Sequence, residues 1–200
     1  IARVAMLDLR VNASPQPADF KVAMMLLKFA EQYAPTDADL VRRRIEAASN
    51  AGDEDGVLDG TRRLLKLDPS DTVAALRLIS TEKIGRLQTA EERLAAYDRY
   101  TGDSASAIDA SVRSRLALDA ALLCRERGDV RGFLDRLKLA AMLDSTNKDA
   151  ALLVYNWVGA ATQEPRVRAE ALSNLLYADP LDPNVHIRMA REFAKGGAYK

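Results

Sequence analysis

The sequence has 200 residues, of which 48% are hydrophobic and 29% are charged, a composition typical of a globular chain with a core. Lysine and arginine together number 29, as do aspartate and glutamate, so the formal net charge is zero. This balance argues against a disordered chain and against a dedicated nucleic-acid binder, and no apolar run is long enough to predict membrane insertion. With one cysteine and one histidine, we expect no internal disulfide, no histidine-based metal or catalytic cluster and no cofactor, and the compartment is left open.

Alanine occurs 34 times and leucine 27 times, against 10 glycines and 7 prolines. Because alanine and leucine are the strongest apolar helix formers, the chain is predicted to be nearly all helical. In chain order, the predicted helices span 2–11, 18–33, 37–51, 54–66, 71–84, 89–100, 107–127, 130–143, 148–161, 165–178 and 183–195.

The helix-breaking residues recur at regular intervals. Taken as equivalent, Pro35, Pro69, Gly102, Ser145 and Pro180 are separated by 34, 33, 43 and 35 residues. The long interval holds about eight extra residues, from 102 to 110, which form either a longer loop or an early extension of the next helix. The regular spacing predicts a repeat of about 34 residues.

A second set of breakers lies between these marks, and its glycines are Gly52, Gly85, Gly128 and Gly197. Proline cannot continue a helix, and a glycine just past a helix end adopts the left-handed conformation that side chains resist. Each repeat is therefore predicted to be an antiparallel helix pair. Because one pair cannot bury both of its apolar faces, neighbouring pairs must stack.

This pattern resembles the tetratricopeptide repeat (TPR), with Gly52-Asp53 in an inner turn and Leu67-Asp68-Pro69 at the end of a repeat. In the last stretch, the family's positions fall on Met189, Ala190, Phe193, Gly197 and Tyr199. The resemblance implies an all-α, right-handed α-solenoid of stacked antiparallel helix pairs. It would be one solenoid of about five repeats plus the first helix of another, over 1–36, 37–70, 71–103, 104–147, 148–182 and 183–200.

Some positions of the repeat are informative in themselves. Arg44 and Arg77 stand where the family has an apolar residue. Small residues fall near the family's close helix contacts, among them Ala23, Ala30, Ala90, Ala140 and Ala169. His186 and Cys124 fall at packing positions, so we interpret both as packing residues rather than as a catalytic base and a nucleophile.

The family usually binds partners in a concave groove lined by the first helix of each pair. Carried over, those positions are Arg42, Glu46, Ser49, Asn50, Ala75, Ile79, Glu82, Lys83, Leu118, Leu122, Arg125, Glu126, Leu153, Trp157, Ala161, Ile187, Arg191 and Lys195. The partner-binding candidates among them are Arg42, Glu46, Asn50, Ile79, Leu118, Leu122, Arg125, Leu153, Trp157 and Arg191. For the apolar middle of this groove, ordinary packing between repeats is the alternative interpretation. Glu46 would repel a ligand carboxylate, which argues against the family's binding of chaperone C-terminal tails.

Two charged clusters also have a simpler interpretation. Asp53-Glu54-Asp55 with Asp59 suggests a calcium loop, but Val57 and Leu64 stand where oxygen ligands are required. We interpret the acidic residues as the N-terminus of a helix. The arginines at 42–44 and 62–63 are interpreted as a solvated face with ion pairs to nearby acids such as Glu46 and residues 53–55, rather than as a phosphate site.

The sequence thus predicts a protein–protein interaction scaffold that binds a partner peptide or helix and has no catalysis of its own. The alternative is the repeat domain of a larger enzyme, or of an envelope or exopolysaccharide-export protein, whose working domain lies outside this segment. A third hypothesis is self-association through the open ends of the solenoid.

Overall fold

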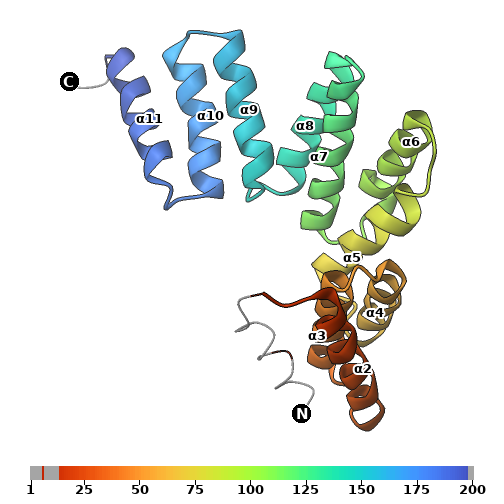
Figure 1. The fold of residues 1–200 in the computed structure, drawn as a ribbon. Helices are drawn as coiled ribbons and strands as arrows, with labels where there is room; N and C mark the ends of the chain where they lie inside the picture. Colours follow the sequence, from red (N-terminus) through yellow and green to blue (C-terminus); the bar gives the residue numbers. More distant parts are fainter. Residues whose placement is uncertain (1–5, 7–13, 198–200) are drawn as a thin grey trace. The chain divides into compact units, whose positions relative to one another are not determined.

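In a computed structural model, Met6 and residues 14–197 are described (Figure 1). These residues form helices and turns and contain no strand, so the all-α prediction is confirmed. The predicted helix over 2–11 lies outside the described residues apart from Met6. The chain divides into two compact units, 1–86 and 87–200, and each is considered by itself.

The first unit is built from helices that begin and end near the predicted residues. They are α2 (Pro17–Tyr33), α3 (Ala38–Asn50), α4 (Glu54–Leu67), α5 (Thr72–Leu78) and the π-helix η1 (Ile79–Ile84). Aspartates begin three of them: the side chains of Asp37, Asp53 and Asp71 accept hydrogen bonds from backbone N–H groups in the first turns of α3, α4 and α5. These caps satisfy donors that a helix start otherwise leaves unpaired.

The α3–α4 pair packs closely. Gly60 on α4 meets Ile45 on α3, and a Cβ atom at Gly60 would lie 2.6 Å from Ile45 Cγ1. The inner turn also depends on glycine, because Gly52 has a φ of 71°, in the left-handed region. The core that these two helices share with α5 contains the buried residues Val41, Ile45, Leu64 and Ala74. The helix pair predicted from the spacing of the breakers is therefore confirmed here.

The single helix predicted over 71–84 is wrong in detail. It is an α-helix to Leu78 and then a π-helix, closed by a hydrogen bond from Gly85 N–H to Ser80 O at 2.7 Å. The wider π turn fits one more residue than an α turn does. Gly85 itself has a φ of −62°, so the left-handed turn predicted there is absent, unlike those at Gly52 and Gly128.

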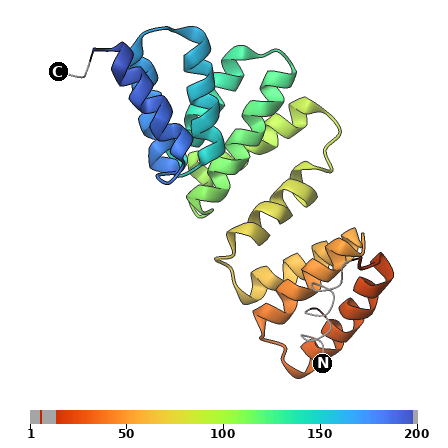
Figure 2. The same cartoon turned by 60° about the vertical axis from the view of Figure 1, so that its left-hand side comes forward.

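The second unit continues the helix pairs with α6 (Ala90–Thr101), α7 (Ala110–Glu126), α8 (Val130–Leu143), α9 (Lys148–Ala161), α10 (Pro165–Ala178) and α11 (Pro183–Lys195). The extra residues after Gly102 form a loop with a short 3-10 helix, η2 (Asp103–Ala105), rather than an early extension of α7. Figures 1 and 2 show α9, α10 and α11 side by side, each packed against the next.

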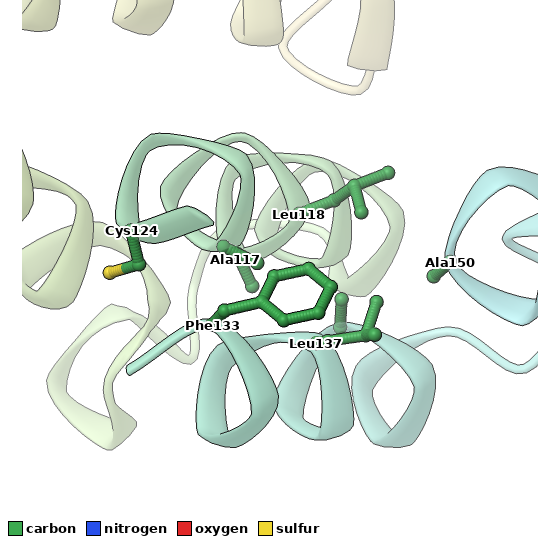
Figure 3. Packing of buried hydrophobic residues seen from close by; sticks show 8 residues of the cluster. Ala117, Leu118, Cys124, Phe133, Leu137 and Ala150 are labelled. Carbon is green, nitrogen blue, oxygen red and sulfur yellow. The ribbon is translucent and has the colours of Figure 1, made fainter. Parts of the chain in front are cut away.

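The central core of this unit lies between α7 and α8 (Figure 3). Phe133 projects from α8 toward Ala117 and Leu118 on α7, and all three are buried. Ala140, predicted at a helix contact, is fully buried, and its carbonyl oxygen accepts a hydrogen bond from Ser114 Oγ at 2.7 Å. Ala169, the other small residue singled out in this unit, is also buried, against α9 and α11.

Candidate partner-binding grooves

An apolar groove of about 420 Å³ runs along α9 in the second unit. One face of α9, with Val154 and Trp157, forms its floor, and the helices α8 and α10, which both pack against α9, line its sides. We call it the Trp157 groove. Its lining residues are Leu134, Leu137, Lys138, Ala141, Met142, Asp144, Ser145, Asn147, Ala151, Val154, Trp157, Val158, Asn174 and Tyr177.

Three large side chains of this groove are open to solvent. The exposed fractions are 39% for Trp157, 73% for Met142 and 69% for Tyr177. The Trp157 ring packs edge-to-face on Phe133, with centroids 5.6 Å apart, and the Arg125 guanidinium lies 5.9 Å from the Phe133 ring centroid. Trp157 is therefore held in place from one side while its other side remains accessible.

The polar groups of the Trp157 groove differ in what they contact. Asn147 caps α9 by accepting from Ala150 N–H at 3.1 Å, and Asp144 Oδ1 accepts from Thr146 N–H and Oγ1 at 2.9 and 2.6 Å. Within the described residues, Lys138 and Asn174 make no hydrogen bond or ion pair through their side chains. The groove therefore offers one free cation and one free amide to a ligand.

A second groove, also of about 420 Å³, lies in the first unit. We call it the Arg42 groove, and its lining residues are Arg42, Ile45, Glu46, Ser49, Asn50, Thr61, Leu64, Asp71, Val73, Ala74 and Arg77. The structure thus brings together Arg42, Glu46, Ser49 and Asn50, which the sequence analysis placed on one surface.

Arg42 is already engaged in this second groove. Its Nη2 lies 2.6 Å from Asp68 Oδ2 and 3.0 Å from Asp71 Oδ2, and the hydrogen bond to Asp71 is the main cause that raises the pKa of Arg42. Asn50 Nδ2 donates to the Glu46 carbonyl oxygen at 2.9 Å. A ligand would have to compete with these contacts, which makes the Arg42 groove the weaker candidate.

Several predicted groove residues lie elsewhere. Leu118 is 1% exposed and belongs to the core, so its assignment to a partner-binding surface is wrong. The reason is that α7 is buried on several sides at once, as its neighbours Ala117 and Ala121 also show. Leu122 and Leu153 are half-buried, and Leu153 packs on the same core. Ile79, half-buried in η1, and Arg191, exposed on α11, line neither groove.

The sequence analysis missed four residues of the Trp157 groove: Lys138, Met142, Asn174 and Tyr177. All four lie on the second helix of a pair, whereas the family resemblance directed attention to first helices. A repeat-by-repeat comparison contains a signal for two of them, because Met142 and Tyr177 each lie three residues before a breaker, Ser145 and Pro180. At that exposed position the other three repeats have polar side chains, namely Gln32, Lys66 and Arg99.

The acidic residues after Gly52 behave as predicted for a helix start. Asp53 Oδ1 accepts a hydrogen bond from Gly56 N–H at 2.9 Å. In the described part of the chain, no group of histidine, cysteine, aspartate and glutamate side chains has the arrangement of a metal site.

No described helix has the length and apolar character needed to cross a membrane.

The arginine run on α3 forms ion pairs, as expected, and the partners include acids other than the nearby ones proposed. Arg42 contacts Asp68 and Asp71, and Arg43 Nε lies 3.0 Å from Asp39 Oδ2. Arg44 is buried and contacts Glu31 and Asp59, so the interpretation of this run as a solvated face is wrong at Arg44. Since these three arginines project in different directions, they do not form one basic patch.

A packing role was predicted for both the single cysteine and the single histidine, and the structure agrees only for the cysteine. Cys124 is fully buried, as predicted, and burial raises the pKa of its thiol. The packing role predicted for His186 is wrong: the side chain is exposed, with Nε2 2.8 Å from the Pro180 carbonyl oxygen. The buried face of α11 is formed instead by Val185 and Met189.

A scan against protein-family models finds no match, and a search of curated proteins finds no relative. Among solved structures, the chain is similar to a thermophilic TPR protein of Thermus thermophilus, at 14% identity over 96% of this chain and 97% of the other, with a TM-score of 0.43. It is also similar to PilW, a type IV pilus biogenesis factor (12% identity, 100% and 93% coverage, TM-score 0.44), and to MamA (14%, 91% and 93%, 0.41). Each unit is itself built from stacked antiparallel helix pairs, the architecture that the repeat spacing predicts.

Proposed function

We propose that this chain is a protein-interaction scaffold, without catalysis of its own, that binds a peptide or helix of a partner protein in the Trp157 groove. The observation that carries the proposal is the exposure of Trp157, Met142 and Tyr177 around one apolar hollow. Tryptophan and tyrosine are enriched among the residues that contribute most of the binding free energy at interfaces. They make this contribution when a partner covers them and removes them from water.

The volume and shape of the groove support the same proposal. About 420 Å³ lies within the range of sites that hold a few side chains or a small ligand, and residues of α9 line the groove together with those of α8 and α10. A helix-built groove changes little on binding, so less conformational entropy is lost than with a mobile loop. An amphipathic helix and an extended peptide both fit this kind of surface.

The Arg42 groove of the first unit is a second, more polar candidate, considered by itself. Its arginine and glutamate side chains favour a role in specificity, because exposed charged groups affect association rate and specificity more than affinity. The Trp157 groove is the stronger candidate, because its large apolar side chains are open to solvent.

The experiment is selection of a phage-displayed library of random dodecapeptides on the immobilised 200-residue chain. We expect enriched peptides that bind the parent and lose binding on Met142→Asp, which places a charge at the rim of the groove. Met25→Asp is the matched control, because Met25 is similarly exposed (69%) on α2, in the first unit.

Circular dichroism of both variants shows whether the helices are intact. Enriched peptides that lose binding equally on Met25→Asp, or that bind Met142→Asp as well as the parent, would show that the Trp157 groove is not the binding site. A library from which no binder is enriched would contradict the proposed function as a whole.

A further inference from the structure

We infer that the partner segment carries an acidic side chain beside its apolar residues, and that Lys138 is the group that pairs with it. This inference rests on the proposed function, because it names the chemistry of the partner for the same groove. The first observation is that Lys138, midway along α8, lines the groove while its ammonium group makes no ion pair or hydrogen bond with any described residue.

Three cations on the helices that line the groove form ion pairs, in contrast to Lys138. On the same helix, Arg136 Nη2 lies 2.8 Å from Asp98 Oδ2. On α9, Lys148 pairs with Asp179 and Asp182, and on α10, Arg168 Nη2 lies 3.2 Å from Glu192 Oε1. Each of these positive charges is therefore neutralised by a carboxylate of the same unit. At Lys138 the positive charge remains available to a ligand.

The groove also carries one negative charge, and the position of this charge favours one orientation of a bound segment. Asp144 lies at the C-terminal end of α8, where its carboxylate already accepts two hydrogen bonds from Thr146. Six residues of helix separate Lys138 from Asp144, a rise of about 9 Å. A partner carboxylate is therefore attracted to the middle of the groove and repelled from its Asp144 end, so the bound segment has a preferred orientation.

The apolar part of the partner follows from the repeat position shared by Met142 and Tyr177. The equivalent side chains in the other repeats are polar and also exposed, as expected for a solvated surface. Where the two repeats border the groove, this solvated position is occupied by a thioether and a phenol ring. Both offer apolar area on opposite sides of Trp157's helix, and the Asn174 amide beside Tyr177 is free to pair with a peptide group of the partner.

These observations favour a protein segment with two or three large apolar side chains and one aspartate or glutamate over a purely apolar or a basic segment. Burial of the apolar side chains against Trp157, Met142 and Tyr177 supplies affinity, and the carboxylate opposite Lys138 supplies specificity.

The test uses peptides enriched from the dodecapeptide library on the parent chain and lost on Met142→Asp. Each is synthesised, and its Kd is measured by the emission of Trp157, the single tryptophan of the chain. We expect an aspartate or glutamate in these peptides, and a roughly tenfold weaker Kd for Lys138→Glu, since the substitution replaces attraction by repulsion. Replacing the acidic residue of the peptide by lysine should restore binding to Lys138→Glu.

Two substitutions serve as controls. Arg131→Glu makes the same change of net charge on the same helix, at a side chain that is 94% exposed and outside the groove, and should leave the Kd within twofold. Asp144→Asn removes the repelling charge and should leave the Kd unchanged or tighten it.

The outcomes separate the two proposals. Groove-dependent peptides that contain no acidic residue, or whose Kd is the same for the parent and Lys138→Glu, would overturn the inference about Lys138 and leave the proposed function standing. Equal weakening by Lys138→Glu and Arg131→Glu would also overturn it, because only net charge would then matter. If no groove-dependent peptide is enriched, both proposals fall.

Discussion

Arg44 on α3 and Glu31 on α2 form an ion pair inside the first unit, with 2.7 Å between Arg44 Nε and Glu31 Oε1 and both side chains 5% exposed. In the described structure these two atoms form an ion pair, but their geometry is not that of a hydrogen bond. Glu31 also lies 3.3 Å from Arg63 Nε, and Arg44 Nη1 lies 3.1 Å from Asp59 Oδ2. A chain of charges therefore links α2, α3 and α4 at a position where the repeat family has an apolar residue.

Replacing Arg44 by methionine should destabilise the fold. Methionine fills a similar volume but leaves the buried Glu31 carboxylate facing only the more exposed Arg63. We expect a loss of about 3 kcal/mol in the free energy of unfolding, because breaking one partner of a buried pair leaves an uncompensated charge. Urea denaturation followed by circular dichroism measures it.

The control is the same substitution at Arg42, whose own side chain is 43% exposed, against 5% for Arg44. Arg42→Met should change the denaturation midpoint much less than Arg44→Met, because solvent screens exposed pairs. Glu31→Gln combined with Arg44→Met should recover part of the lost stability. Equal effects of the two arginine substitutions would contradict the structural role of the buried pair.

The position of Arg44 shows what the sequence predicts well and what it leaves out. The repeat spacing places residue 44 on the buried face of α3, which is correct, but the partners that make burial of a guanidinium tolerable lie 13 and 15 residues away in sequence, on two other helices. Helix limits depend on local breakers and caps such as Asp37 and Gly52, so they are predicted closely. Pairings between helices depend on tertiary packing, which no local pattern encodes.

The candidate site was predicted only in part for a related reason. Trp157, singled out from the sequence, lines the apolar groove, but Leu118, which the sequence placed on the same surface, is buried in the core. The hollow opens instead between α8 and α10, where Met142 and Tyr177 lie. A family pattern states which positions face a neighbour on average. It does not state where two helices leave a gap, because that depends on the volumes of the side chains between them.

Ala140→Arg should be strongly destabilising. Ala140 is fully buried between α7 and α8, and its carbonyl accepts from Ser114, so a guanidinium there introduces both excess volume and an unpaired charge. We expect a loss of at least about 2 kcal/mol in the free energy of unfolding. Met142→Arg, two residues further along α8 and 73% exposed, is the control and should leave the denaturation midpoint nearly unchanged. An unaltered midpoint for Ala140→Arg would mean that the helix contact is wrongly placed.

Cys124 should be unreactive in the folded protein. It is fully buried in the α7–α8 core, and burial raises the pKa of the thiol, so the reactive thiolate is scarce and inaccessible at neutral pH. A thiol reagent such as dithionitrobenzoate should react at the rate of unfolding in buffer and at once in denaturant. Rapid reaction with the native protein would show that this core opens readily.

Asp119→Asn should stabilise the protein at neutral pH. Burial raises the pKa of the Asp119 carboxyl above its ordinary value, and Arg115, with Nε 3.7 Å from Asp119 Oδ1, only partly opposes this. A carboxyl whose folded pKa is raised lowers stability as the pH rises through that folded pKa, because the charged form is disfavoured in the fold.

Asparagine has no such charge, so the parent and the variant should be equally stable in acid, where Asp119 is protonated. They should diverge in favour of the variant as the pH increases. Urea denaturation of both proteins across this pH range measures the difference. A parent that is more stable than Asp119→Asn at neutral pH would show that the Arg115 contact outweighs the cost of burial.

Fluorescence quenching and substitution of Trp157 distinguish a side chain on a binding surface from one in the core. With 39% of its surface exposed, its emission should be quenched by acrylamide more than that of a buried tryptophan, although less than that of a free one. Trp157→Ala should weaken a groove-dependent peptide by on the order of 2 kcal/mol, because a central aromatic is lost from the contact. The loss of the edge-to-face contact with Phe133 should cost stability of only about 1 kcal/mol. If Trp157→Ala instead unfolds the helices, or if acrylamide leaves the native emission unquenched, the side chain is part of the core and the groove has no central aromatic to offer a partner.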